Sequence, residues 1–312
     1  MRIVLLGATG FVGHHLLPQL SKAGHQSLVL SRYPPGCREL SIIPGVEVRR
    51  ANIFDSGTLE QCFDGADAVI NMVGILNESG RNGKGFHRAH VELTEMMIAA
   101  CRAAGVRRLL QVSALNAGKG TSHYLISKGK AEELIRAADG LDATIFQPSV
   151  IFGEGDSFFN RFAALLKITP VLPLACPNAK MQPVWVEDLA AAMTLSLEDR
   201  ETFGKTLVAV GPEIFTLREL VAYAAEAAGL KRIIIGLPDS LSRLQGLVMD
   251  FVPGKPFSSD NYRSLQTDNT SVENSLLQFG INPRALQTVV PEYLSESAHQ
   301  HHLDEYRKRA GR

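Results

Sequence analysis

The stretch GATGFVG at residues 7–13 constrains the fold more than any other part of the sequence. The apolar run RIVLLG leads into it. The segment that follows, FVGHHLLPQLSKAG, has apolar residues at helical spacing and ends at a glycine. The sequence therefore predicts a strand, a glycine-rich turn and a helix within residues 2–24.

The alternation of strands and helices continues as far as residue 153. We predict further strands at 25–32, 46–53, 67–74, 107–114 and 142–153, and helices at 58–66, 91–105 and 124–138. Near-continuously apolar strands that alternate with helices are typical of a parallel sheet covered on both faces. The expected fold class is therefore α/β, a Rossmann-like doubly wound parallel sheet with a smaller C-terminal lobe.

Glycines at a strand–helix junction favour the binding of a phosphate group for a physical reason. They permit a tight turn and a close approach of the backbone, while the first helical turn offers free N–H groups and a positive dipole end to phosphates. We therefore expect a nicotinamide dinucleotide to bind at this turn. The predicted contacts in it are Gly7, Thr9, Gly10, Phe11, Val12 and Gly13.

The end of the second strand bears on the choice between NAD(H) and NADP(H). A carboxylate there would bond the ribose 2′-OH, but this sequence has Ser31 and Arg32, and no acid before Glu39. A guanidinium suits a 2′-phosphate, although Arg32 could also be a solvated charge. We predict NADP(H) in preference to NAD(H). The other contacts predicted at strand ends are Asn52, Ile53, Val73, Gly74 and Pro148.

The pattern loosens after residue 153, where proline-rich loops mix with short helices. We therefore expect an NADP(H)-binding Rossmann domain over 1–153, with its sheet completed by segments from about 180–210, and a smaller mixed α/β lobe over 154–312. We interpret the histidines of the polar tail, 297–312, as part of a solvated helix end rather than as metal ligands.

Tyr124 and Lys128 lie four residues apart in a predicted helix, so both side chains share one face. An ammonium beside the phenol would lower the pKa of Tyr124, and both residues are also predicted to contact the cofactor. Ser113, at the end of the fifth strand, is the candidate that orients a substrate oxygen, although it could bond only local backbone. Lys130 competes with Lys128, and Ser122 is interpreted as a helix N-cap.

Five motifs together, GATGFVG, INMVG, QVSALNA, Y-x-x-x-K and QPSVIFGEGD, resemble the extended and atypical short-chain dehydrogenase/reductase superfamily, whose members include epimerase/dehydratase-like proteins. Nearly the whole chain, including SHYLISKGKAEE, QPVWVEDLAAAM and LQTDN, is more closely similar to the family of the nucleotide-binding accessory subunit nine of the complex I alpha subcomplex and its bacterial relatives. The resemblance implies an NADP(H)-binding fold. Active superfamily members use the tyrosine for proton transfer, whereas accessory members hold a nucleotide without known turnover.

Three residues depart from the pattern of the family. Asn52 stands where relatives often have an acid, and Gln147 stands where an arginine would be expected before Pro–Ser. His90 occupies a position where extended members usually have asparagine, which puts a proton-relay role in doubt. The segment after Ser113 also lacks the additional hydroxyl residues that active extended members commonly carry.

The substrate side is expected in the segments FGEGDSFFNRFAALL and MQPVWVEDL. Their aromatic residues would suit an apolar ring such as a quinone or isoprenoid, although Phe158 and Phe159 could instead pack the core of the lobe and Asp188 could cap a helix. The candidates are Phe158, Phe159, Arg161, Gln182, Trp185, Glu187 and Asp188.

Two functions follow as hypotheses. The first is an NADP(H)-dependent oxidoreductase that acts on an apolar carbonyl or quinone-related substrate linked to respiratory or quinone metabolism. The alternative is a non-catalytic nucleotide-binding accessory or assembly factor of a respiratory or quinone-biosynthetic complex.

Composition argues against other classes. Lys plus Arg and Asp plus Glu each number 32, so no global charge favours nucleic acid. The four cysteines have no C-x-x-C spacing, and we expect reduced, mostly buried thiols with no metal site. No window has about 18 apolar residues, so we expect no transmembrane segment. A cytoplasmic protein is expected, with peripheral association at the inner face of a membrane left open.

Overall fold

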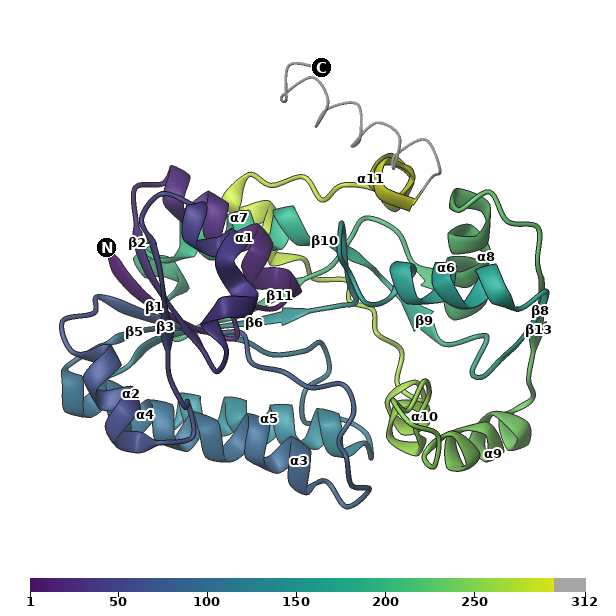
Figure 1. Cartoon of the computed structure of the whole chain (residues 1–312), viewed down its shortest axis with the longest axis horizontal. Coiled ribbons are helices and arrows are strands. Elements are labelled where there is room, and N and C mark those ends of the chain that lie inside the picture. The colour runs from purple at the N-terminus through teal and green to yellow at the C-terminus, as the bar shows by residue number, and fades with distance from the viewer. Residues whose placement is uncertain (295–312) are drawn as a thin grey trace.

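A seven-stranded parallel sheet forms the centre of the larger part of the molecule (Figure 1). The computed structural model describes residues 1–294, so the predicted tail at 297–312 lies outside the described residues. The strand order is β11-β6-β5-β4-β1-β2-β3, which confirms the predicted doubly wound α/β sheet. The strands are β1 (Arg2–Leu6), β2 (Gln26–Ser31), β3 (Val46–Arg50), β4 (Ala68–Asn71), β5 (Arg108–Val112), β6 (Asp142–Pro148) and β11 (Thr206–Ala209).

Helices cover both faces of this sheet (Figure 1). Along β1, Ile3 and Leu5 belong to the core shared with α1 and α7, whereas Val4 and Leu6 belong to the core shared with α2 and α4. Successive strand residues point to opposite faces, so an unbroken apolar run can serve both cores. The covering helices are α1 (Phe11–Lys22) and α7 (Val186–Ser196) on one face, and α2 (Ser56–Phe63), α4 (Leu93–Ala104) and α5 (His123–Arg136) on the other.

The smaller lobe has its own apolar core, built on Phe152, Phe159 and Leu220. Its helices are α6 (Phe159–Ile168), α8 (Leu217–Ala227), α9 (Asp239–Met249), α10 (Ser259–Ser264) and α11 (Leu286–Leu294). Short strand pairs join it: β8 (Val171–Leu174) with β13 (Ile233–Gly236), β7 (Ile151–Phe152) with β10 (Val184–Trp185), and β9 (Lys180–Met181) with β12 (Phe215–Thr216). The division of the chain at residue 153 stays a prediction.

Three predicted elements differ from the structure. The strand predicted at 46–53 ends at Arg50, because Asn52 Oδ1 accepts the Phe54 N–H and turns the chain. The strand predicted at 142–153 is divided into β6 and β7. The helix predicted at 91–105 begins earlier in the structure, with α3 (Lys84–Phe86) and a π-helix, η2 (His87–Glu92), ahead of α4. Glycines in this segment interrupt the helical pattern of the sequence. The remaining short helices are η1 (Pro34–Ile42), η3 (Arg200–Thr202) and η4 (Ser275–Phe279).

The cysteines follow their expected environments. Cys37, Cys62 and Cys101 are buried, Cys176 is half-buried, and all four are unpaired. Within residues 1–294, no helix is both long and apolar enough to cross a membrane.

Candidate functional site

Gly7 and Gly13 hold the β1–α1 turn against its neighbours. Gly7 has a φ of 79°, and a Cβ on it would lie 2.8 Å from the Val73 amide nitrogen. A Cβ on Gly13 would lie 2.1 Å from the Ala8 carbonyl oxygen. Any side chain at either position would therefore push the turn away from β4 or push α1 away from β1.

The first turn of α1 is suited to an anion. Its N-cap is Gly10, which offers no side-chain hydrogen bond, and the first helical turn contains no acidic residue. The N–H groups of Phe11, Val12 and Gly13 therefore keep their donor capacity, and no acidic residue of the turn itself neutralises the positive end of the helix dipole. Together with Thr9 in the same turn, these residues fit the pyrophosphate of a dinucleotide.

The ends of β2 and β3 lie side by side, since Ser31 pairs with Arg50. Ser31 is buried and its Oγ accepts the Tyr33 N–H at 3.2 Å, so it supports the loop, whereas Arg32 is exposed. Asn52 is exposed and Ile53 packs against the core that includes α2. Arg32 thus stands where a 2′-phosphate was predicted to lie, and its role stays a prediction.

One polar link at this turn was missed by the sequence reasoning. His14 Nδ1 donates to the Gly10 carbonyl oxygen at 2.9 Å, and His14 Nε2 lies 3.4 Å from Glu39 Oε1. Glu39 therefore contacts the first turn of α1, although it is eight residues beyond the end of β2. A histidine inside a helix carries no sequence signal for such a contact.

Lys128 connects the ends of two central strands. Its side chain is buried, and Nζ donates to the Val112 carbonyl oxygen at 3.1 Å and the Val73 carbonyl oxygen at 3.4 Å. Gly74 adjoins it, because a Cβ there would lie 3.4 Å from Nζ. Burial lowers the pKa of Lys128 to about 8, with the charge of Glu132 opposing the shift. Lys130 is exposed, so Lys128 is the lysine at the sheet edge.

Tyr124 is half-buried one turn before Lys128 on α5. Its ring makes edge contacts with Phe86 and His90 at centroid distances of 6.1 and 5.8 Å. Burial raises the pKa of Tyr124 to about 12. The expectation that Lys128 lowers this pKa is therefore wrong for the structure, in which the ammonium is directed at the two backbone carbonyls.

Ser113 follows β5 directly. Its N–H donates to the Phe146 carbonyl oxygen at 2.7 Å, but its buried Oγ has no hydrogen-bond partner among the described residues. The interpretation that this hydroxyl bonds only local backbone is therefore wrong. Since Lys128 bonds the preceding carbonyl, of Val112, Ser113 and Lys128 meet at the carboxyl end of β5. A buried hydroxyl without a partner is costly, and an oxygen of a ligand would satisfy it.

His90 links α5 to the loop after β4. Its Nε2 accepts the Ile75 N–H at 3.3 Å, and its Nδ1 lies 2.8 Å from Ser127 Oγ, which donates to the Tyr124 carbonyl oxygen at 2.8 Å. Burial, assisted by the charge of Lys128, lowers the pKa of His90 to about 2. The imidazole therefore stays neutral and links the loop after β4 to α5.

Gln147 takes part in a second link behind α5. Its Nε2 donates to both carboxylate oxygens of the buried Glu132 at 2.9 Å, and Arg136 pairs with the same carboxylate. Arg136 of α5 thus supplies the positive charge that an arginine at position 147 would have given. Pro148 is buried at the end of β6, where its carbonyl oxygen accepts the Leu115 N–H at 2.9 Å.

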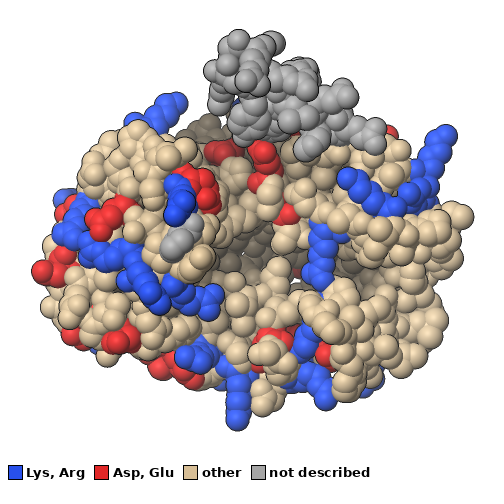
Figure 2. All heavy atoms as spheres, viewed as in Figure 1, with Lys and Arg blue, Asp and Glu red and all other residues tan. Residues whose placement is uncertain are grey.

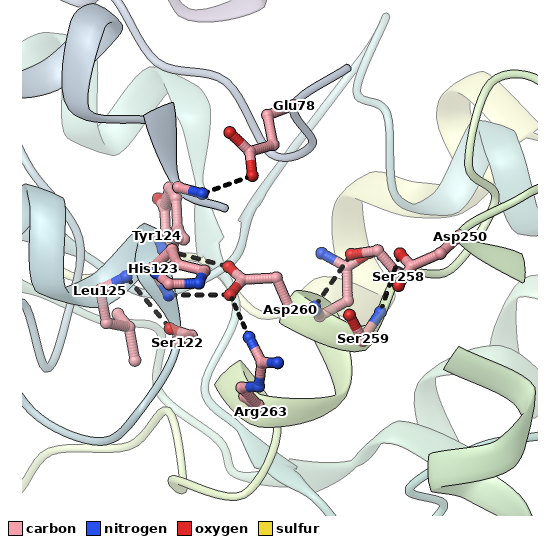
Figure 3. A network of polar contacts seen from close by, with 12 residues as sticks. Glu78, Ser122, His123, Tyr124, Leu125, Asp250, Ser258, Ser259, Asp260 and Arg263 are labelled. Atoms are coloured by element: carbon pink, nitrogen blue, oxygen red, sulfur yellow. Dashed lines mark hydrogen bonds and ion pairs between the residues drawn. The ribbon is translucent and has the colours of Figure 1, made fainter. Parts of the chain in front are cut away.

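The first turn of α5 is bonded from the other lobe (Figure 3). Asp260 of α10 accepts the His123 N–H at 2.8 Å and the Tyr124 N–H at 3.1 Å. Ser122 is the N-cap and accepts the Leu125 N–H at 3.1 Å, which confirms its interpretation. Sequence reasoning missed Asp260, because it lies 136 residues after Tyr124 and no local pattern marks it.

The residues expected on the substrate side mostly serve the framework. Phe159 is fully buried, and the centre of the Phe158 ring lies 5.1 Å from the centre of the Phe159 ring. This agrees with the alternative that both residues pack the core of the lobe. The idea that Asp188 caps a helix is wrong, because the N-cap of α7 is Trp185, and Asp188 instead accepts the Arg284 N–H. Gln182 forms hydrogen bonds with Gly211 and Ser271, and the Trp185 ring lies against the Arg284 guanidinium. Glu187 forms hydrogen bonds with His15 and Gln19, and the exposed Arg161 donates to the Lys255 carbonyl oxygen.

Comparison with known proteins agrees with this geometry. A family model described as NAD(P)H-binding matches residues 7–158. Subunit 9 of the mitochondrial NADH dehydrogenase [ubiquinone] 1 alpha subcomplex from Arabidopsis thaliana is 30% identical over 288 residues, which cover 87% of this chain and 71% of that protein. The chain belongs to the family of this subunit 9. Its residues 7–158 form an NAD(P)H-binding domain.

Two further similarities extend the comparison. Ceramide reductase from Caulobacter vibrioides is 30% identical over 251 residues, which cover 80% of this chain and 77% of that protein. The structure of a dTDP-glucose 4,6-dehydratase from Streptomyces venezuelae with NAD bound has a TM-score of 0.76 at 18% identity, covering 94% of this chain and 96% of that one. This last likeness shows a shared fold.

Proposed function

We propose that this protein is an NADP(H)-dependent oxidoreductase that reduces an apolar carbonyl or quinone-related substrate linked to respiratory or quinone metabolism. The observation that carries the proposal is the buried, unpartnered hydroxyl of Ser113 at the strand end that Lys128 also reaches. Such a hydroxyl keeps its hydrogen-bonding capacity for the oxygen of a substrate. The name of one relative, ceramide reductase, supports an apolar substrate.

Each of the three side chains has a distinct role in this proposal. A bound nicotinamide would supply the hydride. Ser113 donates a hydrogen bond to the substrate oxygen, and Tyr124, whose raised pKa keeps its phenol protonated near neutral pH, donates the proton. Lys128, with a pKa of about 8, carries a positive charge at neutral pH, and its remaining N–H would bind a ribose hydroxyl of the nucleotide.

Cofactor choice and location are part of the same proposal. Exposed Arg32 at the end of β2 supports NADP(H) over NAD(H), because a guanidinium can make paired charge-assisted bonds to a 2′-phosphate. We place the protein in the cytoplasm, in peripheral contact with the inner face of a membrane, where apolar substrates are found.

Replacement of Tyr124 by Phe tests the reaction. NADPH oxidation is measured with a long-chain methyl ketone and with a quinone analogue. We expect kcat to fall about a hundredfold or more, while nucleotide affinity stays within about threefold because the phenol contributes little to binding. Tyr223→Phe, a matched change in the core of the other lobe, should leave both unchanged. Unchanged turnover in Tyr124→Phe would refute the assignment.

The alternative is a non-catalytic accessory or assembly factor of a respiratory or quinone-biosynthetic complex. The subunit nine relatives favour it, and so does the engagement of Lys128 Nζ by two backbone carbonyls. In this case Tyr124→Phe would complement a deletion strain, whereas Arg32→Glu, which repels the nucleotide phosphate, would not. Failure of Tyr124→Phe to complement, with nucleotide binding intact, would exclude the alternative.

A further inference from the structure

Helix α9 presents its apolar side chains outward. Its buried residues are Ser242 and Gly246. In contrast, Leu241, Leu244, Leu247 and Val248 are 47%, 53%, 46% and 56% exposed, and Phe251 and Val252 beyond the helix are 74% and 38% exposed. The first four recur at helical spacing along one side of α9 and the last two follow its end; all six are named here the α9 stripe. The usual arrangement of a helix on a globular core is the reverse.

Small residues of α9 lie where the helix packs against the lobe. Ser242 Oγ accepts the Cys176 N–H at 3.0 Å. A Cβ on Gly246 would lie 3.2 Å from the Ser258 carbonyl oxygen, so the chain before α10 approaches α9 closely there. The α9 stripe is therefore not needed to hold the helix in place. A contiguous exposed apolar surface of this kind marks an interaction site.

The charge around the α9 stripe is mainly positive. Arg243 is exposed on α9 itself, and the Arg81 guanidinium lies 4.4 Å from the centre of the Phe251 ring. Of the acids in this part of the chain, Asp250 and Asp260 are buried, which leaves Asp239 at the start of the helix. Figure 1 places α9 at the lower right of the molecule, where Figure 2 shows a mostly uncharged surface with Lys and Arg side chains beside it.

We propose that the α9 stripe inserts into the surface of an anionic membrane, with Arg81 and Arg243 at the level of the lipid headgroups. An apolar helix side flanked by cations matches both the acyl region and the negative headgroups. An acidic protein partner would match the cations but leaves the length of the apolar stripe unexplained. The inference rests on the proposed function, since an apolar substrate would be dissolved in the same membrane.

The α9 stripe is connected to the candidate active site. Asp250, between Met249 and Phe251, accepts the Ser259 N–H at 3.2 Å through Oδ1, and Ser259 begins α10. The next residue, Asp260, bonds the N–H of Tyr124 (Figure 3). The membrane-facing segment is thus joined by two short links to the residue that is proposed to deliver the proton.

Vesicle co-sedimentation of the full chain tests the inference. Vesicles of phosphatidylcholine with phosphatidylglycerol are compared with vesicles of phosphatidylcholine alone. We expect binding to the anionic vesicles, a loss of about thirtyfold or more in Leu244→Gln/Leu247→Gln, and a loss of about thirtyfold in Arg81→Gln/Arg243→Gln. Leu195→Gln/Leu277→Gln, with comparably exposed side chains elsewhere, should bind as the wild type does.

Three results would overturn the inference. They are no binding of the wild type to either vesicle, binding that Leu244→Gln/Leu247→Gln leaves unchanged, and a wild-type dimer that this variant converts to a monomer, which would assign the stripe to a second copy. Nucleotide affinity of each variant reports on folding. Turnover of a water-soluble ketone separates the claims: turnover without vesicle binding refutes the membrane surface alone, and vesicle binding without turnover refutes the reductase proposal alone.

Discussion

Gly13→Ala tests the β1–α1 turn. We expect this substitution to lower the free energy of unfolding, whereas the same change inside a helix usually raises it. Gly13 lies inside α1, where replacing glycine by alanine ordinarily stabilises a helix by about 1 kcal/mol. Here the new Cβ would lie 2.1 Å from the Ala8 carbonyl oxygen and 2.4 Å from Ala8 Cα, well inside the 3.4 Å at which ordinary contact begins. Both neighbours are backbone, so only a shift of α1 from β1 relieves the clash.

The expected magnitude follows from these two terms. Overpacking against rigid neighbours costs about 3 kcal/mol, the upper end of the usual range. Subtracting the helix-propensity gain of about 1 kcal/mol leaves a net destabilisation of about 2 kcal/mol. Nucleotide affinity should fall as well, because the first turn of α1 moves with the helix.

Urea unfolding measures the effect as a change in midpoint at constant m-value. Gly57→Ala in α2 is the matched control, since its Cβ would meet only Asp55 Oδ1, at 3.5 Å. We expect that control to be stabilised by about 0.5 kcal/mol. A Gly13→Ala protein as stable as the wild type, or more stable, would refute the account of the turn.

Two further predictions concern cofactor choice and pH. Arg32→Ala should weaken NADPH binding by about tenfold or more and NADH binding little, with Arg102→Ala on α4 as the unaffected control; equal losses for both nucleotides would refute the NADP(H) assignment. Burial lowers the pKa of His15, but the hydrogen bonds of His15 to Glu187 and to the Glu154 carbonyl raise it, and the net shift is upward. The contribution of His15 to the free energy of unfolding is therefore present below about pH 6.5 and is lost as the pH rises through the pKa of the folded state. His15→Gln should therefore reduce the free energy of unfolding more at about pH 6 than at about pH 9, and an equal reduction at both would contradict this.

Local patterns were enough to predict the sheet and the glycine turn. Gly7, Gly10 and Gly13 were placed correctly at the β1–α1 junction because strand, turn and helix signals coincide there. Helical spacing likewise predicted that Tyr124 and Lys128 lie one turn apart on α5.

Other features depend on contacts between distant segments and could not be predicted. Asp260 bonds the N–H of Tyr124 from another lobe, and the environment of Lys128 is set by the carbonyls of Val73 and Val112. The pKa of Tyr124 was expected to fall but is raised, because the sequence shows a nearby lysine and does not show burial. The outward stripe of α9 was also hidden, since amphipathic spacing alone does not say which side of a helix faces the core.

The most direct test of the central claim is a single-turnover transfer of deuterium. Wild-type protein is mixed with a long-chain methyl ketone and NADPH that carries deuterium at nicotinamide C4. We expect the alcohol product to carry deuterium on the former carbonyl carbon, and we expect Tyr124→Phe to bind the nucleotide yet form no product over the same time. Absence of deuterium transfer by the wild type, or equal transfer by Tyr124→Phe, would contradict it.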